Sequence, residues 1–134
     1  MIHSVVDFRG SKVRDVMVPA AEVAALRSGA STQEALELSA STGLDRLPVL
    51  APDGQPAGLV NVLDILLERN GNKPLGEYVR RIVTTTDDQP AYRVMQQLRG
   101  ARLTLAAVVD RKNNFRGIVA IEDLVRHLVS TGNA

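Results

Sequence analysis

The amino-acid sequence predicts an α/β (α+β) fold of two βαββα modules that pack sheet to sheet with pseudo-twofold symmetry. The first observation is an internal repeat at an offset of 59 residues. The second is that the same order of short strands and helices recurs in both halves. The third is an apolar fraction of 45% with only 3% aromatic residues, which indicates an aliphatic core. A module of about 60 residues buries too little apolar surface alone, so each is expected to cover the other's sheet.

The repeat needs no gaps in the region where each half passes from its strands into its last helix. Four residues of the first half fall on identical residues of the second: Val49 on Val108, Gly58 on Gly117, Val60 on Val119 and Asp64 on Asp123. The repeat predicts a first module over residues 11–69 and a second over 75–130. Residues 70–74 (Asn-Gly-Asn-Lys-Pro) are rich in turn formers and are predicted to be the linker.

The first module has a main helix with recognisable ends. Ser31 and Glu34 form a capping box at its start, and Gly43 ends it. The Pro-Asp-Gly turn at 52–54 separates two strands. In order, the predicted elements are a short helix Ser11–Met17, a strand Glu22–Leu26, the main helix, the strands Arg46–Leu50 and Ala57–Val60, and a helix from Val62 to about Arg69.

The second module repeats this order. Its main helix is predicted to follow Pro90, whose fixed φ suits a first helical turn, and to stop at Gly100. The predicted elements are a short helix Leu75–Tyr78, a strand Arg81–Thr84, the main helix, a strand Leu103–Val109, a turn at 110–114, a strand Phe115–Val119 and a helix from Ile121 to about Ser130.

Composition excludes several classes of function. The absence of cysteine excludes a disulfide scaffold, a thiolate metal site and a cysteine nucleophile. A net charge of +1 and few aromatic residues argue against nucleic-acid binding. No stretch approaches the roughly 18 consecutive apolar residues of a membrane span. Neither a convergent acid–base pair nor a nucleophile or phosphate-loop motif is visible, so the chain is predicted not to be an enzyme. His127 is predicted to be a surface or interface residue.

The strand–helix junction is the motif that carries a functional prediction. It occurs as Gly58-Leu-Val-Asn-Val-Leu-Asp64 and again as Gly117-Ile-Val-Ala-Ile-Glu-Asp123. The glycine permits close approach of a backbone, the helix N-terminus suits phosphate, and the aspartate can accept hydrogen bonds from a diol such as ribose. In the alternative without a ligand, Asn61 is an N-cap with Asp64 as its partner at N3. Ala120 is a poor N-cap, yet Asp123 is still present.

The repeated junction resembles that of CBS domains. More narrowly, Val-Arg-Asp-Val-Met-Val-Pro at 13–19 is similar to the opening of the CBS pair (Bateman module) in the CorC/HlyC family. That family comprises hemolysin-like, CNNM-related membrane proteins linked to magnesium and cobalt efflux. Gly-Leu-Asp-Arg-Leu-Pro-Val at 43–49 resembles its Gly-His-Ser-Arg-aromatic-Pro-Val. The run at 117–124 resembles its Gly-Ile-Val-Thr-Leu-Glu-Asp-Leu, and the likeness covers nearly the whole chain.

This resemblance implies an adenine nucleotide, AMP or ATP, in each module. Mg²⁺ would enter only as the counterion of the polyphosphate, without an intrinsic metal site. Asp64 and Asp123 would bind ribose hydroxyls. Asn61 would stand where a Thr or Ser contacts phosphate or ribose, and Ala120 holds the corresponding place in the second module. Arg46 is a candidate for phosphate pairing, or alternatively forms a surface ion pair with a nearby aspartate.

The resemblance also assigns a lining to each adenine slot. In the first module these residues are Val18, Pro19 and Pro48, and in the second they are Val83, Thr84 and Ala107. Ala120 departs from the family pattern because it lacks a hydroxyl, Ala20 replaces an arginine, and residues 111–115 replace an acidic, Gly-rich turn. The sequence therefore favours Asn61 and Asp64 as a nucleotide site and marks Asp123 beside Ala120 as a weakened or altered one.

The function implied is that of a regulatory CBS pair on the cytoplasmic side of an inner or plasma membrane protein. The chain is interpreted as an excerpt of such a protein. Its expected partners are the adenine nucleotide, the membrane domain of the parent protein, and a second copy in a flat disc of two CBS pairs. The alternative is a structural dimerisation module whose clefts hold no nucleotide.

Overall fold

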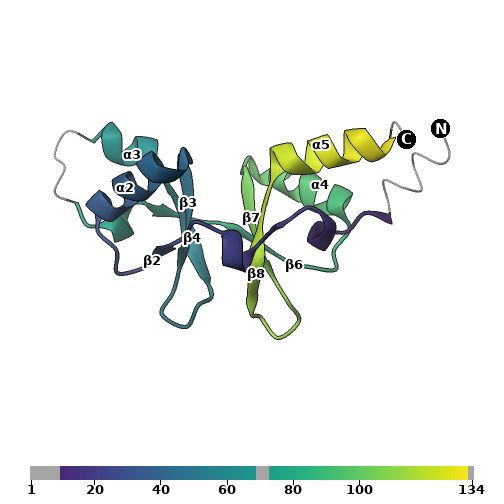
Figure 1. Cartoon of the computed structure of the whole chain (residues 1–134), viewed down its shortest axis with the longest axis horizontal. Coiled ribbons are helices and arrows are strands. Elements are labelled where there is room, and N and C mark those ends of the chain that lie inside the picture. Colours follow the sequence, from purple (N-terminus) through teal and green to yellow (C-terminus); the bar gives the residue numbers. More distant parts are fainter. Residues whose placement is uncertain (1–9, 69–72, 133–134) are drawn as a thin grey trace. The chain divides into compact units, whose positions relative to one another are not determined.

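The computed structural model describes residues 10–68 and 73–132, and the chain divides into two compact units. The central unit comprises residues 24–82, and the terminal unit combines residues up to Val23 with those from Val83 onward. Each unit contains a four-stranded mixed sheet with α-helices packed against it (Figure 1). Of the predicted linker, residues 70–72 lie outside the described part of the chain.

The central unit has the strand order β2-β3-β4-β5. Strand β2 (Leu26–Arg27) runs parallel to β3 (Arg46–Leu50), which is antiparallel to β4 (Pro56–Asn61); β4 is antiparallel in turn to β5 (Val79–Arg80). Helices α2 (Thr32–Thr42) and α3 (Val62–Leu66) contribute to one core with the sheet (Figure 1). A 3-10 turn at Leu75–Tyr78 leads into β5. Another, at Ala20–Glu22, lies in the terminal unit just before the central unit begins.

Local sequence signals account for helix α2. The Oγ atom of Ser31 accepts the N–H of Glu34 at 3.1 Å, which satisfies one free donor of the first turn. Gly43 follows the helix with a φ of 75°, in the left-handed region that favours glycine. Ser31 as the N-cap and Gly43 as the end of the helix are therefore confirmed. Pro48 is fully buried in β3. It has no N–H to donate, yet it remains in register with Leu59 of β4.

The terminal unit has the strand order β6-β7-β8-β1. Strand β6 (Val83–Thr86) is parallel to β7 (Leu105–Val109), which is antiparallel to β8 (Phe115–Ala120); β8 is antiparallel to β1 (Val18–Pro19). Helices α4 (Ala91–Ala101) and α5 (Ile121–Gly132) complete the unit (Figure 1). All five residues of β7 are buried, and Val13 from the N-terminal segment is fully buried in the same core.

The N-terminal segment packs within the terminal unit, whereas the sequence prediction groups residues 11–23 with the first module. The N–H of Val13 donates to the carbonyl oxygen of Gln89 at 2.9 Å, and the N–H of Ala91 donates to that of Ser11 at 2.8 Å. Strand β1 then pairs with β8. The physical reason is that this pairing covers the edge of β8, which would otherwise expose unpaired backbone groups.

Several element boundaries also differ from the sequence prediction. Gly100 lies inside α4, and the helix ends at Ala101. The C-cap is Arg102, whose φ is 57° and whose N–H reaches the carbonyl oxygens of Leu98 and Arg99. The predicted helix Ser11–Met17 is a single 3-10 turn at Val13–Asp15. The helix does begin directly after Pro90, as predicted, with Pro90 at the N-cap position. Strands β2, β6 and β7 also start later than expected, and α3 ends at Leu66 rather than near residue 69.

Both sheets nevertheless have one topology, a parallel pair followed by two antiparallel pairs. At the offset of 59 residues, β3 and β4 correspond to β7 and β8. The fourth strand is β5 in the central unit and β1 in the terminal unit. The predicted mixed fold of two related modules is confirmed, but the chain supplies the last strand of the second sheet from its N-terminal segment.

Candidate functional site

The glycine of each junction accommodates a strand of the chain itself. A Cβ atom on Gly58 would overlap the side chain of Val79 and the carbonyl oxygen of Arg80, both in β5. A Cβ atom on Gly117 would overlap the carbonyl oxygen of Val18 in β1. The close backbone approach expected at these glycines is therefore confirmed, and the approaching backbone is the fourth strand of each sheet.

Asn61 is the N-cap of α3. Its Oδ1 atom accepts the N–H of Leu63 at 3.0 Å, and the N–H of Val62 donates to the carbonyl oxygen of Asp45 at 2.8 Å. The capping interpretation of Asn61 is thus confirmed, although the predicted partner Asp64 faces a different residue. The side-chain oxygen of Asn61 is already engaged within the helix terminus.

Asp64 forms a bidentate ion pair with Arg80. The guanidinium Nε donates to Oδ2 at 2.9 Å, and Nη2 donates to Oδ1 at 3.0 Å, so both carboxylate oxygens are used. The Asp64 side chain is 26% exposed, whereas that of Arg80 is 67% exposed. Sequence reasoning missed Arg80, because the two-residue strand β5 that carries it has no periodicity and its partner is identified only by strand pairing.

A cavity of about 310 Å³ lies beside this ion pair. A second ion pair borders it, in which Lys73 Nζ donates to Glu68 Oε2 at 3.1 Å. The hydrogen bond to Glu68 raises the pKa of Lys73, with the charge of the same carboxylate adding to the effect. The size lies at the lower end of the range for small-molecule pockets, about 300–1,000 Å³. The wall is completed by Leu67, Glu77 and Tyr78.

Asp123 has a looser environment than Asp64. In the part of the chain that the structure describes, Asp123 pairs with Arg126 of the same helix, whose Nη1 atom lies 3.2 Å from Oδ1. The Asp123 side chain is 35% exposed and that of Arg126 is 76% exposed. The N–H of Ile121 donates to the carbonyl oxygen of Thr104 at 2.9 Å. Ala120 has no side-chain oxygen with which to cap the next N–H group of the helix.

Four residues form a continuous row across the terminal sheet. Thr84 is in register with Ala107, Ala107 with Ile118, and Ile118 with Val18. Residues in register share one face of a sheet, and the next residues along their strands, such as Val83, face the core. The row therefore lies on the face opposite the core. The side chain of Val83 is not part of it, in contrast to the role predicted for that residue.

Val18 and Pro19 are the main correction to the predicted sites. They were assigned to the slot of the first module with Pro48, but β1 places them beside Gly117 and Ile118 of the terminal unit. The cause is the non-local pairing of β1 with β8. The terminal unit thus contains Val18, Pro19, Val83, Thr84, Ala107, Ala120 and Asp123, and the central unit contains Arg46, Pro48, Asn61 and Asp64.

Arg46 is opposite Asn61 in the β3–β4 register. Its Nη1 atom lies 3.5 Å from Oδ1 of Asp45, and both side chains are well exposed. The structure therefore contains the surface ion pair that was the alternative to a phosphate contact. An exposed pair of this kind contributes little to stability and leaves the guanidinium available to other anions.

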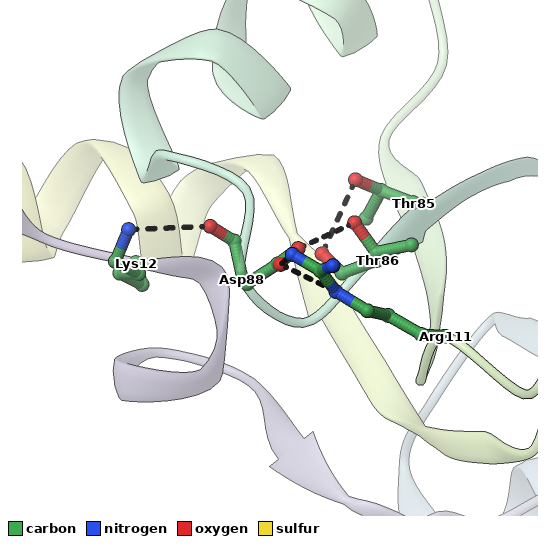
Figure 2. A network of polar contacts seen from close by, with 5 residues as sticks. All are labelled: Lys12, Thr85, Thr86, Asp88 and Arg111. Carbon is green, nitrogen blue, oxygen red and sulfur yellow. Dashed lines mark hydrogen bonds and ion pairs between the residues drawn. The ribbon is translucent and has the colours of Figure 1, made fainter.

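A polar network fixes the loop between β6 and α4 (Figure 2). Arg111 donates to Oδ2 of Asp88 through Nη2 at 2.7 Å and Nε at 3.2 Å, and Thr86 Oγ1 donates to Oδ1 at 2.8 Å. Lys12 Nζ donates to the carbonyl oxygen of Asp88 at 3.4 Å. The Arg111 hydrogen bonds, followed by that of Thr86, lower the pKa of Asp88 to about 2. The network ties the N-terminal segment to the loop and so helps to hold β1 in place.

Comparison with known proteins identifies the family. The sequence model of the CBS domain family matches the chain twice, over residues 13–71 and 75–130. The chain belongs to the CBS domain family. Over 133 residues it is 24% identical to the magnesium and cobalt efflux protein CorC of Escherichia coli, covering 96% of this chain and 46% of CorC. The chain thus spans about half the length of the curated relatives it matches.

Solved structures of CBS domains share the fold. One is the CBS domain of a bacterial CNNM/CorC family Mg²⁺ transporter in complex with ATP, with a TM-score of 0.86 and 23% identity, covering 96% of this chain and 94% of that one. Another is CBSX2 in complex with AMP, with a TM-score of 0.77 and 21% identity, covering 90% and 98%. At these identities the likeness establishes the fold of the CBS pair.

The two CBS domains are not equivalent in their junction contacts. In the first, Asn61 caps its helix and Asp64 is held by Arg80. In the second, the equivalent of Asn61 is Ala120, and Asp123 contacts an exposed arginine one turn further along its own helix. His127 of this second domain is half-buried, with Nε2 at 3.1 Å from Oγ of Ser11, so it packs against the N-terminal segment.

Neither a membrane span nor a cluster of metal-binding side chains occurs among the described residues. Within residues 10–68 and 73–132, no helix is long and apolar enough to span a lipid bilayer. The same residues contain no group of three or more His, Cys, Asp or Glu side chains arranged to hold a metal ion.

Proposed function

We propose that this CBS pair binds an adenine nucleotide, AMP or ATP, at the junction around Asp123 and thereby regulates a membrane protein of the magnesium and cobalt efflux type. The observation that carries the proposal is the difference between the two junction aspartates. Both oxygens of Asp64 are engaged by Arg80, whereas among the described residues Asp123 receives one hydrogen bond, from the exposed side chain of Arg126. This reverses the preference for Asp64 that the sequence alone favoured.

The second CBS domain offers a suitable surface for each part of the ligand. In the row across the terminal sheet Ala107 is buried, while Thr84 is exposed and Ile118 and Val18 are partly exposed, so these three side chains offer a largely apolar surface to an adenine ring, with the exposed Pro19 beside it. The carboxylate of Asp123 can accept two hydrogen bonds from a ribose diol. The first turn of α5 directs N–H groups and the positive end of its dipole toward a phosphate.

Ala120 is compatible with this arrangement. A capping side chain would consume one N–H group at the start of α5, as Asn61 does in α3. With alanine at this position, the helix N-terminus remains available to phosphate oxygens. The contact between Asp123 and Arg126 is an exposed pair three residues apart, of a kind that contributes about 0.3–0.5 kcal/mol, so a ligand displaces it at little cost.

The comparisons support the class of ligand and of partner. Two of the structures that share this fold are complexes, one with ATP and one with AMP. The relative from Escherichia coli, CorC, is a magnesium and cobalt efflux protein. On this proposal the CBS pair acts on the cytoplasmic side, where adenine nucleotides are available, and carries no catalytic step. Any Mg²⁺ arrives with the polyphosphate.

Calorimetric titration with AMP, ADP and ATP, with and without Mg²⁺, tests this function. We expect the wild-type chain to bind, Asp123→Asn to weaken binding by roughly 10-fold or more, and Asp64→Asn to leave it within about 2-fold. The first figure follows from the loss of charged hydrogen bonds, about 1.5–3 kcal/mol. Absence of binding at millimolar nucleotide would refute the proposal.

The alternative function is a structural dimerisation module, and one observation favours it. Leu63, Leu66 and Leu67 lie three and four residues apart at α3 and are exposed, and so are Val125 and Val129 on α5. Exposed apolar side chains in such groups are typical of interaction surfaces. A second copy in a CBS disc is the proposed occupant. Sedimentation with and without ATP separates the functions, because a purely structural module forms a dimer that is indifferent to nucleotide.

A further inference from the structure

We propose that Arg80 acts as an internal ligand that closes the Asp64 junction of the central unit, so that the chain holds one nucleotide and not two. This inference rests on the proposed function of the second domain. The guanidinium of Arg80 occupies both oxygens of Asp64, the carboxylate that a ribose diol would otherwise engage. An arginine fork fits a carboxylate with two parallel hydrogen bonds, which makes it an effective competitor of a diol.

Strand register shows which residue of the terminal unit occupies the position that Arg80 has in the central unit. Arg80 is opposite Leu59 in β4, and Val18 is opposite Ile118 in β8. Leu59 and Ile118 are equivalent at the 59-residue offset, so Arg80 and Val18 occupy equivalent positions. The glycines agree, because Gly58 faces the carbonyl oxygen of Arg80 where Gly117 faces that of Val18. Valine cannot form an ion pair, and Asp123 therefore lacks the partner that Asp64 has.

The surroundings of Asp64 provide space rather than a packed core. The cavity of about 310 Å³ is bordered by Asp64 and Arg80 and by Leu67, which is 79% exposed. Arg80 itself is largely exposed, so its removal leaves no buried void. The other cation of the cavity, Lys73, is paired with Glu68 and does not replace it. Replacing Arg80 thus frees the carboxylate beside an existing cavity.

The experiment replaces Arg80 of the central unit with the residue type found at the equivalent position of the terminal unit. Arg80→Val introduces the valine that the terminal unit has at the equivalent position, Val18. Arg80→Ala provides a second variant with a smaller side chain. Arg81→Val is the matched control, because Arg81 is an exposed neighbour on the same segment. Calorimetry and equilibrium dialysis with ATP and AMP then count the nucleotides bound per chain, with circular dichroism to verify folding.

The expected number of nucleotides is one for the wild type and for Arg81→Val, and two for Arg80→Val and Arg80→Ala. Adding Asp64→Asn to Arg80→Val should return the number to one. In the background of Asp123→Asn, where the wild-type site is weakened roughly 10-fold or more, the change at Arg80 should add one site whose affinity Asp64→Asn lowers. A wild-type chain that binds two nucleotides, or folded Arg80 variants that still bind one, would overturn the inference.

The outcomes also separate this inference from the proposed function. If the wild type binds nothing but Arg80→Val binds one nucleotide that Asp64→Asn removes, the assignment to Asp123 fails and the role of Arg80 stands. If the wild type and both folded Arg80 variants bind one nucleotide lost in Asp123→Asn, the function stands and the role of Arg80 is wrong. If no variant binds at millimolar nucleotide, both are refuted.

Discussion

Replacing Gly117 by alanine should displace β1 from its sheet. A Cβ atom at this position would overlap the carbonyl oxygen of Val18 and lie 3.3 Å from Cα of Pro19. Both neighbours are backbone atoms, so no change of rotamer can relieve the overlap, and the strand itself must move. Because Val18 belongs to the row that we assign to the adenine ring, the displacement should also weaken nucleotide binding.

The magnitude follows from two opposing effects. Forcing an additional methyl group into a packed contact costs about 1–3 kcal/mol. Replacing glycine restricts the unfolded chain and returns about 0.4–1 kcal/mol. The net loss in the free energy of unfolding is therefore about 1–2 kcal/mol, on the order of a 10-fold change in the ratio of folded to unfolded protein.

Urea unfolding measures this loss, and Gly100→Ala is the matched control. Gly100 lies within helix α4 with no atom near its would-be Cβ, so the same substitution should stabilise the protein by about 0.5–1 kcal/mol. We expect the urea midpoint to fall for Gly117→Ala and to rise for Gly100→Ala. A Gly117→Ala protein with a wild-type midpoint and wild-type nucleotide affinity would refute the proposed contact between β1 and β8.

Three further predictions concern stability. Asn61→Ala removes the cap of α3 and should lower the free energy of unfolding by about 1 kcal/mol in urea titrations, whereas no change would contradict the capping contact. Leu98→Ala empties a fully buried position and should cost about 2–5 kcal/mol by the same method, against almost nothing for the exposed Leu67→Ala. The pKa of Asp88 is depressed from 3.8 to about 2, so its stabilising effect is present above pH 3.8 and is lost as the pH falls toward 2. Urea midpoints of wild type and Asp88→Asn should accordingly differ at pH 5 and converge near pH 2, and a constant difference would count against this network.

The family of the protein and its repeated order of elements could be predicted from sequence, but the partition of site residues could not. The junction motif, the aspartates and the row residues Thr84 and Ala107 were all identified as candidates. Their grouping was wrong for Val18 and Pro19, and the preference for Asp64 was formed without knowledge of Arg80. The grouping of Val18 and Pro19 and the missed Arg80 have one origin, the fourth strand of each sheet. Strands of two residues have no alternation of apolar and polar side chains by which they could be recognised.

What the sequence by itself determined is the set of local structures. Ser31 and Gly43 delimit α2, and Asn61 begins α3, because a cap depends on residues within one turn of it in the chain. The tertiary structure alone decided that Val18 pairs with Ile118 and that Arg80 reaches Asp64. Neither contact lies within one turn of the chain, because each depends on a two-residue strand pairing with β8 or with β4. The difference between a carboxylate held by arginine and one beside valine is therefore a property of the folded chain.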